Sequence, residues 1–339
     1  MQKRTKITAS LLISLGILCA GTSLGSSSIS LYHTLRIVLH KILSLPLAAQ
    51  MDPRNITIVW NLRFPRALLA FMVGGALAMS GAVFQSILKN QLASPYILGV
   101  SSGASLGAAL VILTGCSLPL IGGFTLPVAG FLFGLLTVWL VIRFATRLDH
   151  TLSNNTIILF GMVFSLFVNA VLTTLSALYR EELKNLLSWQ MGSFALKGWS
   201  YVGLMLPFLI LGVFGLIRYP QEMDILTFGD EQAQSMGLDT RSIRMRLLVY
   251  SAILTGGAVA LSGVIGFVDL IAPHLARKII GSNHAAVLPM SFFIGGSLLV
   301  VTDLIARTIL SPSELPVGAI TALIGAPFFA WVYFKKSKK

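Results

Sequence analysis

Long runs of apolar residues, separated by short groups of polar and basic residues, recur along the whole chain. A helix that spans a lipid bilayer needs about 20 predominantly apolar residues. The pattern therefore predicts an all-α polytopic membrane protein, with about ten transmembrane helices in one transmembrane domain over residues 1–339. The predicted spans are 7–25, 65–87, 95–115, 121–142, 156–178, 200–217, 246–264, 266–280, 288–308 and 316–334.

Two longer stretches lie between the predicted spans. Residues 26–62 form an outer segment, and its part 29–47 is amphipathic, which favours a helix along the membrane surface. Residues 218–246 form the largest inner segment, and acidic residues cluster there. Its part 230–236 is compatible with a short helix that ends at Gly237.

The chain contains an internal repeat. MVGGALAMSG at 72–81 and LTGGAVALSG at 254–263 share the pattern Gly-Gly-Ala-x-Ala-x-Ser-Gly. LPVAGFLFG at 126–134 and LPMSFFIGG at 288–296 share a second pattern. The partners of each pair lie five predicted spans apart and therefore cross the membrane in opposite directions. This arrangement predicts an inverted repeat, spans two to five against seven to ten, of the kind that builds many transporters. The eighth span is short and contains Pro273, so we expect it to be kinked or broken.

Composition supports the membrane assignment. The chain is 55% hydrophobic and 11% charged, whereas a soluble domain carries about 25% charged residues. The net charge of +13 could indicate a nucleic-acid partner, but most of the 25 lysines and arginines fall on inner segments if the N-terminus is cytoplasmic. We therefore interpret them as orientation signals and predict cytoplasmic termini and no nucleic-acid partner. Residues 7–20 resemble a signal peptide, but many spans follow, which favours a retained first helix.

Several chemistries find no support in the sequence. There is no Gly-x-x-x-x-Gly-Lys-Ser/Thr loop, so the chain itself should not bind ATP. The two cysteines, Cys19 and Cys116, imply no disulfide framework. No His or Cys pair has metal-ligand spacing, and the isolated His274 and His284 are interpreted as structural. We predict a protein that is not an enzyme and that holds no metal or cofactor.

Charged residues at the predicted span ends are candidates for function. Arg63 and Arg66 lie at the outer end of the second span and Arg307 at the outer end of the ninth. They could extend to the membrane interface, or they could form a basic patch for an acidic partner outside. Asp303 lies four residues before Arg307, so a pair within one helix is the simplest interpretation. Asp269 has no partner by spacing, which makes it a candidate for a pathway-lining or partnered residue.

Six longer strings of the chain form a recognisable series. They are LRFPRALLA at 62–70, GGALAMSGAVFQ at 74–85, LASPYILGVSSGASLG at 92–107, LLSWQMGSF at 186–194, GFVDLIAPHLAR at 266–277 and ELPVGAITALIGAPFFAWV at 314–332. Together these strings resemble the FecCD family of binding-protein-dependent ABC transporter permeases, which includes iron-siderophore, haem and vitamin B12 importers. The resemblance keeps its order over nearly the whole chain after residue 60.

The resemblance implies a permease in the bacterial cytoplasmic membrane that moves ferric siderophores, or haem or cobalamin, by alternating access. It implies two cytoplasmic ATP-binding cassette subunits, an extracytoplasmic substrate-binding protein, and a second permease copy or a sister permease. It also implies that residues 186–194 form an outer half-helix at the substrate exit. The implied site residues are Arg63, Arg66 and Arg307 for docking the binding protein, Glu231, Ala233, Gln234, Ser235 and Gly237 for ATPase coupling, Ser153, Asn154 and Asn155 for an inner gate, and Gln85 with Asp269 along the pathway.

The chain departs from the family pattern in four places. Family members often read Asn-Pro-Leu-Ala where residues 90–93 read Asn-Gln-Leu-Ala, and they often carry Gly at the position of Asp269 and Val at the position of Ala272. The gate residues also differ from the small hydroxyl residues that the family leads us to expect. An ion- or proton-coupled secondary transporter is the main alternative, because inverted repeats and Asp269 suit it as well and it needs no ATPase. A non-transporting membrane scaffold is a second alternative. The long ordered resemblance favours the ABC permease over both.

Overall fold

The computed structural model of the chain describes residues 2–25, 29–44, 52–119, 121–149 and 152–337, which form helices and loops without a β-strand. The α-helices are α1 (Gln2–Ser23), α2 (Leu31–Leu43), α3 (Pro53–Thr57), α4 (Phe64–Ile87), α5 (Val100–Thr114), α6 (Thr125–Leu148), α7 (Asn154–Leu178), α8 (Leu183–Gln190), α9 (Trp199–Leu216), α10 (Pro220–Leu226), α11 (Asp230–Ser235), α12 (Thr240–Ser262), α13 (Val268–Ile280), α14 (His284–Thr308) and α15 (Val317–Ser337). A π-helical turn, Ile58–Arg63, joins α3 to α4.

Every predicted span coincides with a helix, which confirms the all-α multi-span architecture. Within the described residues, seven helical stretches are long and apolar enough to cross a membrane. The other three predicted spans correspond to α5, α13 and the apolar part of α15, which are shorter than 18 residues. The number of full crossings therefore stays a prediction.

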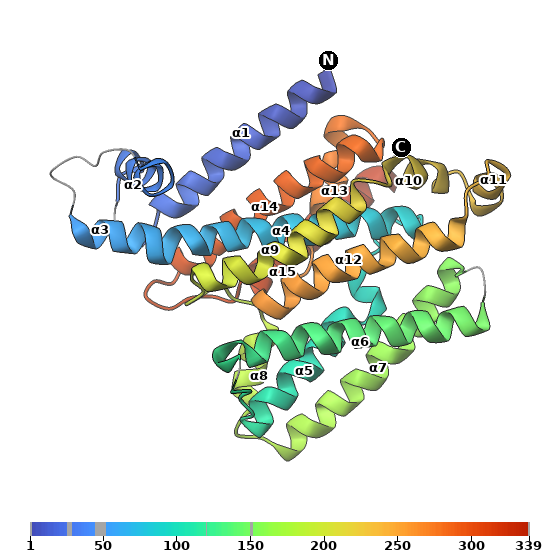
Figure 1. Cartoon of the computed structure of the whole chain (residues 1–339), viewed down its shortest axis with the longest axis horizontal. Helices are drawn as coiled ribbons and strands as arrows, with labels where there is room; N and C mark the ends of the chain where they lie inside the picture. The colour runs from blue at the N-terminus through green and yellow to red at the C-terminus, as the bar shows by residue number, and fades with distance from the viewer. Residues whose placement is uncertain (1, 26–28, 45–51, 120, 150–151, 338–339) are drawn as a thin grey trace.

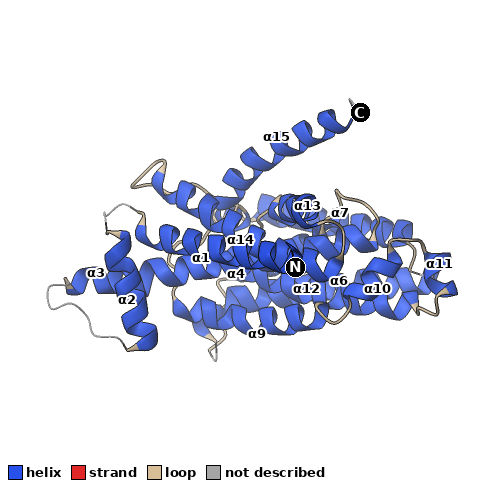
Figure 2. Cartoon of the chain, turned by 90° about the horizontal axis from the view of Figure 1, so that it is seen from above, coloured by secondary structure: helices blue, strands red, loops and turns tan. Residues whose placement is uncertain are grey.

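The predicted outer segment 26–62 contains more helix than expected. The second span begins at Pro53 rather than at 65, because α3, the π-helical turn and α4 form one continuous helical stretch. The Asp52 side chain accepts a hydrogen bond from the Arg54 N–H at 2.8 Å and caps this helix. The amphipathic part forms α2, although residues 26–28 and 45–51 lie outside the described residues. Helix α2 runs across the axis of the bundle in both views (Figures 1 and 2), as a helix on a membrane surface would.

The repeat appears in the packing. Helices α4 and α12 carry the two glycine-rich strings and run in opposite directions (Figure 1). Helix α4 packs on α14, and its counterpart α12 packs on α6, so the same contact is made twice, each time between a helix of one half and a helix of the other. A Cβ at Gly74 would overlap the carbonyl oxygen of Gly295, and one at Gly257 would overlap the Phe208 ring. The small residues thus allow close helix contact, as membrane packing requires.

The break in the eighth span lies before helix α13 rather than at Pro273. Residues 263–267 are not helical, and α13 begins at Val268 with Pro273 inside it. Proline has no N–H for the carbonyl four residues earlier, which is that of Asp269. The Gln85 side chain on α4 donates to this carbonyl at 3.5 Å instead. A neighbouring helix therefore satisfies the backbone group that the proline leaves free.

The two ends of the bundle differ. Helices α2 and α3 lie at one end, and α10 and α11 lie at the other, with both termini nearer to α10 and α11 (Figure 1). Helix α4 runs through the centre, and its spanning stretch is mostly buried. Helix α15 extends away from the bundle toward its C-terminal end (Figure 2), and its Leu323 and Trp331 side chains are exposed.

Candidate functional site

A pocket of about 470 Å³ lies at the α3 end of the bundle. Four basic side chains line it, together with one carboxylate, so we call it the arginine pocket. The three arginines predicted for docking, which are far apart in sequence, come together here. The charged lining residues are Arg63, Arg66, Lys197, Arg307 and Glu314.

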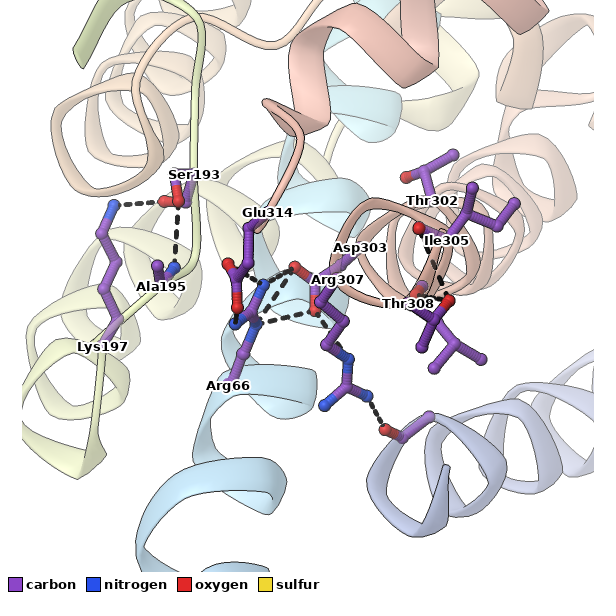
Figure 3. A network of polar contacts seen from close by, with 12 residues as sticks. Arg66, Ser193, Ala195, Lys197, Thr302, Asp303, Ile305, Arg307, Thr308 and Glu314 are labelled. Atoms are coloured by element: carbon purple, nitrogen blue, oxygen red, sulfur yellow. Dashed lines mark hydrogen bonds and ion pairs between the residues drawn. The ribbon is translucent and has the colours of Figure 1, made fainter. Parts of the chain in front are cut away.

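Arg66 lies between two carboxylates (Figure 3). Its guanidinium donates to both oxygens of Asp303, at 2.7 and 3.0 Å, and to both oxygens of Glu314, also at 2.7 and 3.0 Å. Asp303 is 2% exposed and Glu314 is 36% exposed. This double bidentate contact joins α4, α14 and the loop before α15. Arg66 is therefore a structural link as well as a part of the pocket wall.

Arg63 and Arg307 hold the end of helix α1. The Arg63 Nη1 donates to the Ser23 carbonyl at 2.6 Å, and the Arg307 Nη2 donates to the Gly21 carbonyl (Figure 3). The last carbonyls of a helix lack partners within the helix, and cations there interact favourably with the helix dipole. The two arginines thus anchor α1 to the bundle, a function that the sequence did not predict.

The predicted pair of Asp303 with Arg307 forms within α14, but it is not the closest contact of Asp303. The Arg307 Nε lies 3.9 Å from Asp303, whereas Arg66 lies 2.7 Å from it. Asp303 is thus bound mainly by an arginine from another helix. Sequence spacing detects contacts between neighbouring turns, but not contacts across helices.

Lys197 is a pocket residue that the sequence did not single out. It lies in the loop between α8 and α9, and its Nζ donates to the carbonyls of Ser193 (2.6 Å) and Leu261. The pKa of Lys197 is lowered to about 7, because burial disfavours its charged form and the Arg66 charge repels it, while Asp303 opposes the shift. The charge of the pocket therefore changes near neutral pH.

The LLSWQMGSF stretch, predicted as an outer half-helix, forms the short helix α8 and a turn after it. The backbone beyond the helix is bonded to two neighbouring elements. The Ser193 N–H donates to the Ser262 carbonyl at 2.8 Å, and the Val317 and Gly318 N–H groups donate to Gly192 and Met191, both at 3.1 Å. The turn thus connects the end of α12 to the start of α15. A place at the substrate exit stays a prediction.

The 218–246 segment forms α10, α11 and the start of α12 at the opposite end, so the span predicted to begin at 246 begins at Thr240. Helix α11 ends in two hydrogen bonds, from Gly237 to the Gln234 carbonyl and from Leu238 to the Ala233 carbonyl, with Gly237 at φ +82°. This pattern confirms the predicted glycine stop. Among the five predicted coupling residues, Ala233 does not fit a contact role, because its side chain is fully buried. Glu231, Gln234, Ser235 and Gly237 are exposed.

Two apolar residues of the same segment were missed by sequence reasoning. Phe228 is 70% exposed, and Met236 is also largely exposed. Both lie outside the helices that could span a membrane. Aromatic residues and methionine are enriched at protein–protein contacts. Apolar residues are common in this chain, so the sequence alone did not single out these two.

Arg244 links the α11 helix to the loop before α7. It is 1% exposed, and it donates to Asp230 at 2.7 Å and to the Leu152 carbonyl at 2.9 Å. Lys89 also contacts Asp230, at 3.1 Å. Partial burial raises the pKa of Asp230, but the hydrogen bonds and charges of Lys89 and Arg244 outweigh burial and lower it. From the sequence, Arg244 is one inner basic residue among many.

The predicted gate residues lie at the first turn of α7. Ser153 precedes the helix, and the Asp149 carboxylate accepts from its N–H at 2.9 Å and from the Thr156 hydroxyl at 3.1 Å. Asn154 follows with a buried side-chain oxygen, and Asn155 is exposed. Leu152, which Arg244 contacts, lies directly before this turn. The gate role itself stays a prediction.

The two pathway candidates belong to one contact between α4 and α13. Asp269 is buried, and its carboxylate accepts from the Ser94 hydroxyl, so it is a partnered residue. Gln85 receives a hydrogen bond from Arg277 and donates to the Asp269 carbonyl. Gln85 also lines a second pocket, of about 530 Å³, near α10. A pathway role for either residue stays a prediction.

The two histidines occupy packing positions. The His284 Nδ1 lies 2.5 Å from Asp224, which also accepts from the His284 N–H at 3.0 Å and so caps α14. His274 packs against the rings of Phe328 and Phe329. Within the described ranges, no three His, Cys, Asp or Glu residues gather as metal ligands would.

These features define a multi-span helical membrane protein with a basic pocket at one end and a partly apolar helical segment at the other. Residues 11–335 match the model of the FecCD transport family. The chain belongs to this family.

Named relatives agree with this assignment. The chain is 41% identical to the uncharacterised ABC transporter permease protein YvrB of Bacillus subtilis (strain 168), over 94% of this chain and 90% of that protein. It is 37% identical to the hemin transport system permease protein HmuU of Yersinia pestis, over 83% of this chain and 84% of that protein. A solved structure, described as an inward-facing conformation of a metal-chelate type ABC transporter, superposes with a TM-score of 0.85 and 31% identity. The match covers 98% of this chain and 99% of that chain.

Proposed function

We propose that the chain is the permease subunit of a binding-protein-dependent ABC importer that moves ferric siderophores by alternating access. Two ATP-binding cassette subunits bind and hydrolyse the ATP, and this subunit is not an enzyme. The observation that carries the proposal is the separation of the two sites. A basic pocket lies at one end of a helical body and an exposed coupling segment at the other, in a member of the FecCD transport family.

The arginine pocket supports docking of an extracytoplasmic binding protein. Its lining carries four basic residues against Glu314, with Asp303 directly behind, so basic residues outnumber acidic ones. Complementary charge accelerates association with an acidic partner. The orientation that follows places this pocket outside and both termini in the cytoplasm of a bacterial cell.

Glu314 offers a sharper docking test than the arginines, which also hold α1 and α14. Glu314→Gln removes a negative charge at the pocket rim and leaves the Arg66–Asp303 contact in place. We expect faster association of the binding protein at low salt, and a smaller gain at high salt. Unchanged association at every salt concentration would contradict docking at this pocket.

The 218–246 segment supports contact with the ATPase subunits. Phe228 and Met236 supply an exposed apolar surface, and Arg244 connects α11 to the turn proposed as the inner gate. ATP-driven closure of the partner pair can thus shift the packing of the permease between two states. The exposed apolar face of α15 supports a contact with a second permease copy or a sister permease.

The cargo is the least constrained part of the proposal. Relatives carry names for hemin, cobalamin, molybdate and Fe(3+) dicitrate. These cargoes share no single chemistry, which fits a permease that leaves recognition to its binding protein. We place ferric siderophores first, then haem and then cobalamin.

The test is uptake of labelled ferric siderophore, haem and cobalamin by cells with and without this chain. The same uptake measurements are repeated in cells whose partner ATPase has a disabled catalytic site. We expect ferric-siderophore uptake to require both proteins. Uptake that needs the chain but not the ATPase would support a proton- or ion-coupled transporter instead. The buried Asp269, which is bonded to Ser94, provides no special support for that alternative.

A further inference from the structure

An apolar groove of about 490 Å³ lies between α1 and α14. Helix α1 diverges from the bundle toward its N-terminal end (Figure 1), and little of its spanning stretch is buried. Two hydroxyl groups in the groove are bonded within the protein, since Ser14 donates to the Phe293 carbonyl (3.2 Å) and Ser297 donates to Ser14 (2.9 Å). The walls therefore present mainly apolar surface, which in a membrane protein faces lipid rather than water.

The length of the groove matches one leaflet of a bilayer. Its α1 wall extends from Lys6 to Ile17, and a helix of that length rises about 16 Å. Half of a hydrocarbon core that is about 30 Å thick measures about 15 Å. A groove with these dimensions can hold one acyl chain along its length. The opposite wall includes Ile279, Ile294 and Val301.

One end of the groove is basic. Lys6 lines it, and the exposed Lys3 lies about one turn before Lys6 on α1. The sequence contains no acidic residue in 1–51 or in 270–302, which supply almost all of both walls. The Lys6 Nζ donates to the Ile279 carbonyl at 2.8 Å, and an ammonium group has further donors for a phosphate. The charge of this end therefore complements an anionic head group.

We propose that this groove binds an anionic phospholipid, with one acyl chain between α1 and α14 and its phosphate at Lys6. The lipid fills the space where α1 leaves the bundle and supplies the packing contacts that the helix lacks there. The proposed orientation assigns it to the cytoplasmic leaflet. The inference rests on membrane insertion of the helices and is independent of ATP-driven import.

The test is native mass spectrometry of the full-length protein released from nanodiscs that contain equal amounts of phosphatidylglycerol and phosphatidylethanolamine with the same acyl chains. We expect retained phosphatidylglycerol to exceed retained phosphatidylethanolamine. One basic residue at a membrane surface changes binding by about fivefold, so Lys6→Ala should lower retention of phosphatidylglycerol by about that factor. Lys184→Ala, an exposed lysine on the distant helix α8, is the matched control and should retain phosphatidylglycerol normally.

A second variant tests the groove apart from the charge. Ala9 lines the groove and is exposed, so Ala9→Phe should fill it and lower retention of both lipids while every basic residue remains. Equal retention of the two lipids by the unmodified chain would overturn the proposal, as would equal effects of Lys6→Ala and Lys184→Ala. Normal retention by Ala9→Phe would also overturn it, because the lipid would then bind by surface charge alone. A second protein chain in place of lipid would show another occupant and would contradict the proposal.

Discussion

Arg244 provides the most direct test of coupling between the two proposed inner elements. Arg244→Met keeps an unbranched side chain of similar length but removes both hydrogen bonds, one to Asp230 on α11 and one to the Leu152 carbonyl before α7. The variant therefore separates α11, the proposed coupling helix, from the proposed gate turn without changing either element. We expect ATP hydrolysis to continue while transport per ATP falls.

The expected loss of coupling can be worked out from the burial of Asp230 and Leu152, the two residues that accept hydrogen bonds from Arg244. Asp230 is 39% exposed and keeps Lys89 at 3.1 Å, so loss of this contact costs about 1 kcal/mol at most. The Leu152 residue is fully buried, and a carbonyl that loses its donor there costs about 1–3 kcal/mol. Together these give about 1–4 kcal/mol. Since 1.4 kcal/mol is about tenfold, the amount of cargo moved per ATP should fall by at least about fivefold.

The assay is uptake and ATP hydrolysis in proteoliposomes that contain the permease, its ATPase subunits and the binding protein. Lys89→Met is the matched control, because it removes the other partner of Asp230 and leaves the Arg244–Leu152 contact intact. We expect the control to transport at close to the normal ratio of cargo to ATP. Equal ratios for Arg244→Met and the unmodified protein, or equal losses in both variants, would refute the reasoning.

Four further outcomes are expected. As pH rises through about 7, Lys197 loses its charge, so affinity for the binding protein should fall between pH 6 and 8, and Lys197→Arg should flatten that profile in surface plasmon resonance. Because the unfolded amine keeps its proton to about pH 10.5, stability should rise over pH 7–10.5, opposite to the docking trend. A Cβ at Gly81 would overlap the Asp269 carbonyl, so Gly81→Ala should lower the thermal midpoint, whereas Gly203→Ala, where nothing lies within 4 Å, should not lower it. Phe228→Ser should weaken ATPase binding by about 2 kcal/mol in a co-purification titration without lowering the thermal midpoint, and an unchanged affinity would remove this residue from the contact.

Charged residues show where sequence reasoning was incomplete. Spacing along a helix paired Asp303 with Arg307, but the main partner of Asp303 is Arg66, from a helix that is remote in sequence. No sequence pattern singled out Lys197 and Arg244, because their contacts are with buried groups on other elements. Asp269 lacked a partner by spacing, and the structure supplies Ser94.

The sequence by itself determined the class of the protein, the helices, the repeat and the glycine stop after α11. These properties depend on local composition and on periodicity, since lipid demands long apolar helices whose backbone bonds are satisfied within each segment. Only the tertiary structure decided that the three arginines proposed for docking share one pocket, that two of them hold the end of α1, and that Arg244 connects α11 to the turn before α7. Contacts between side chains from different helices depend on how the helices rotate and tilt against one another. The rotation and tilt are fixed by small residues that face each other on two packed helices, so they cannot be found from either helix alone.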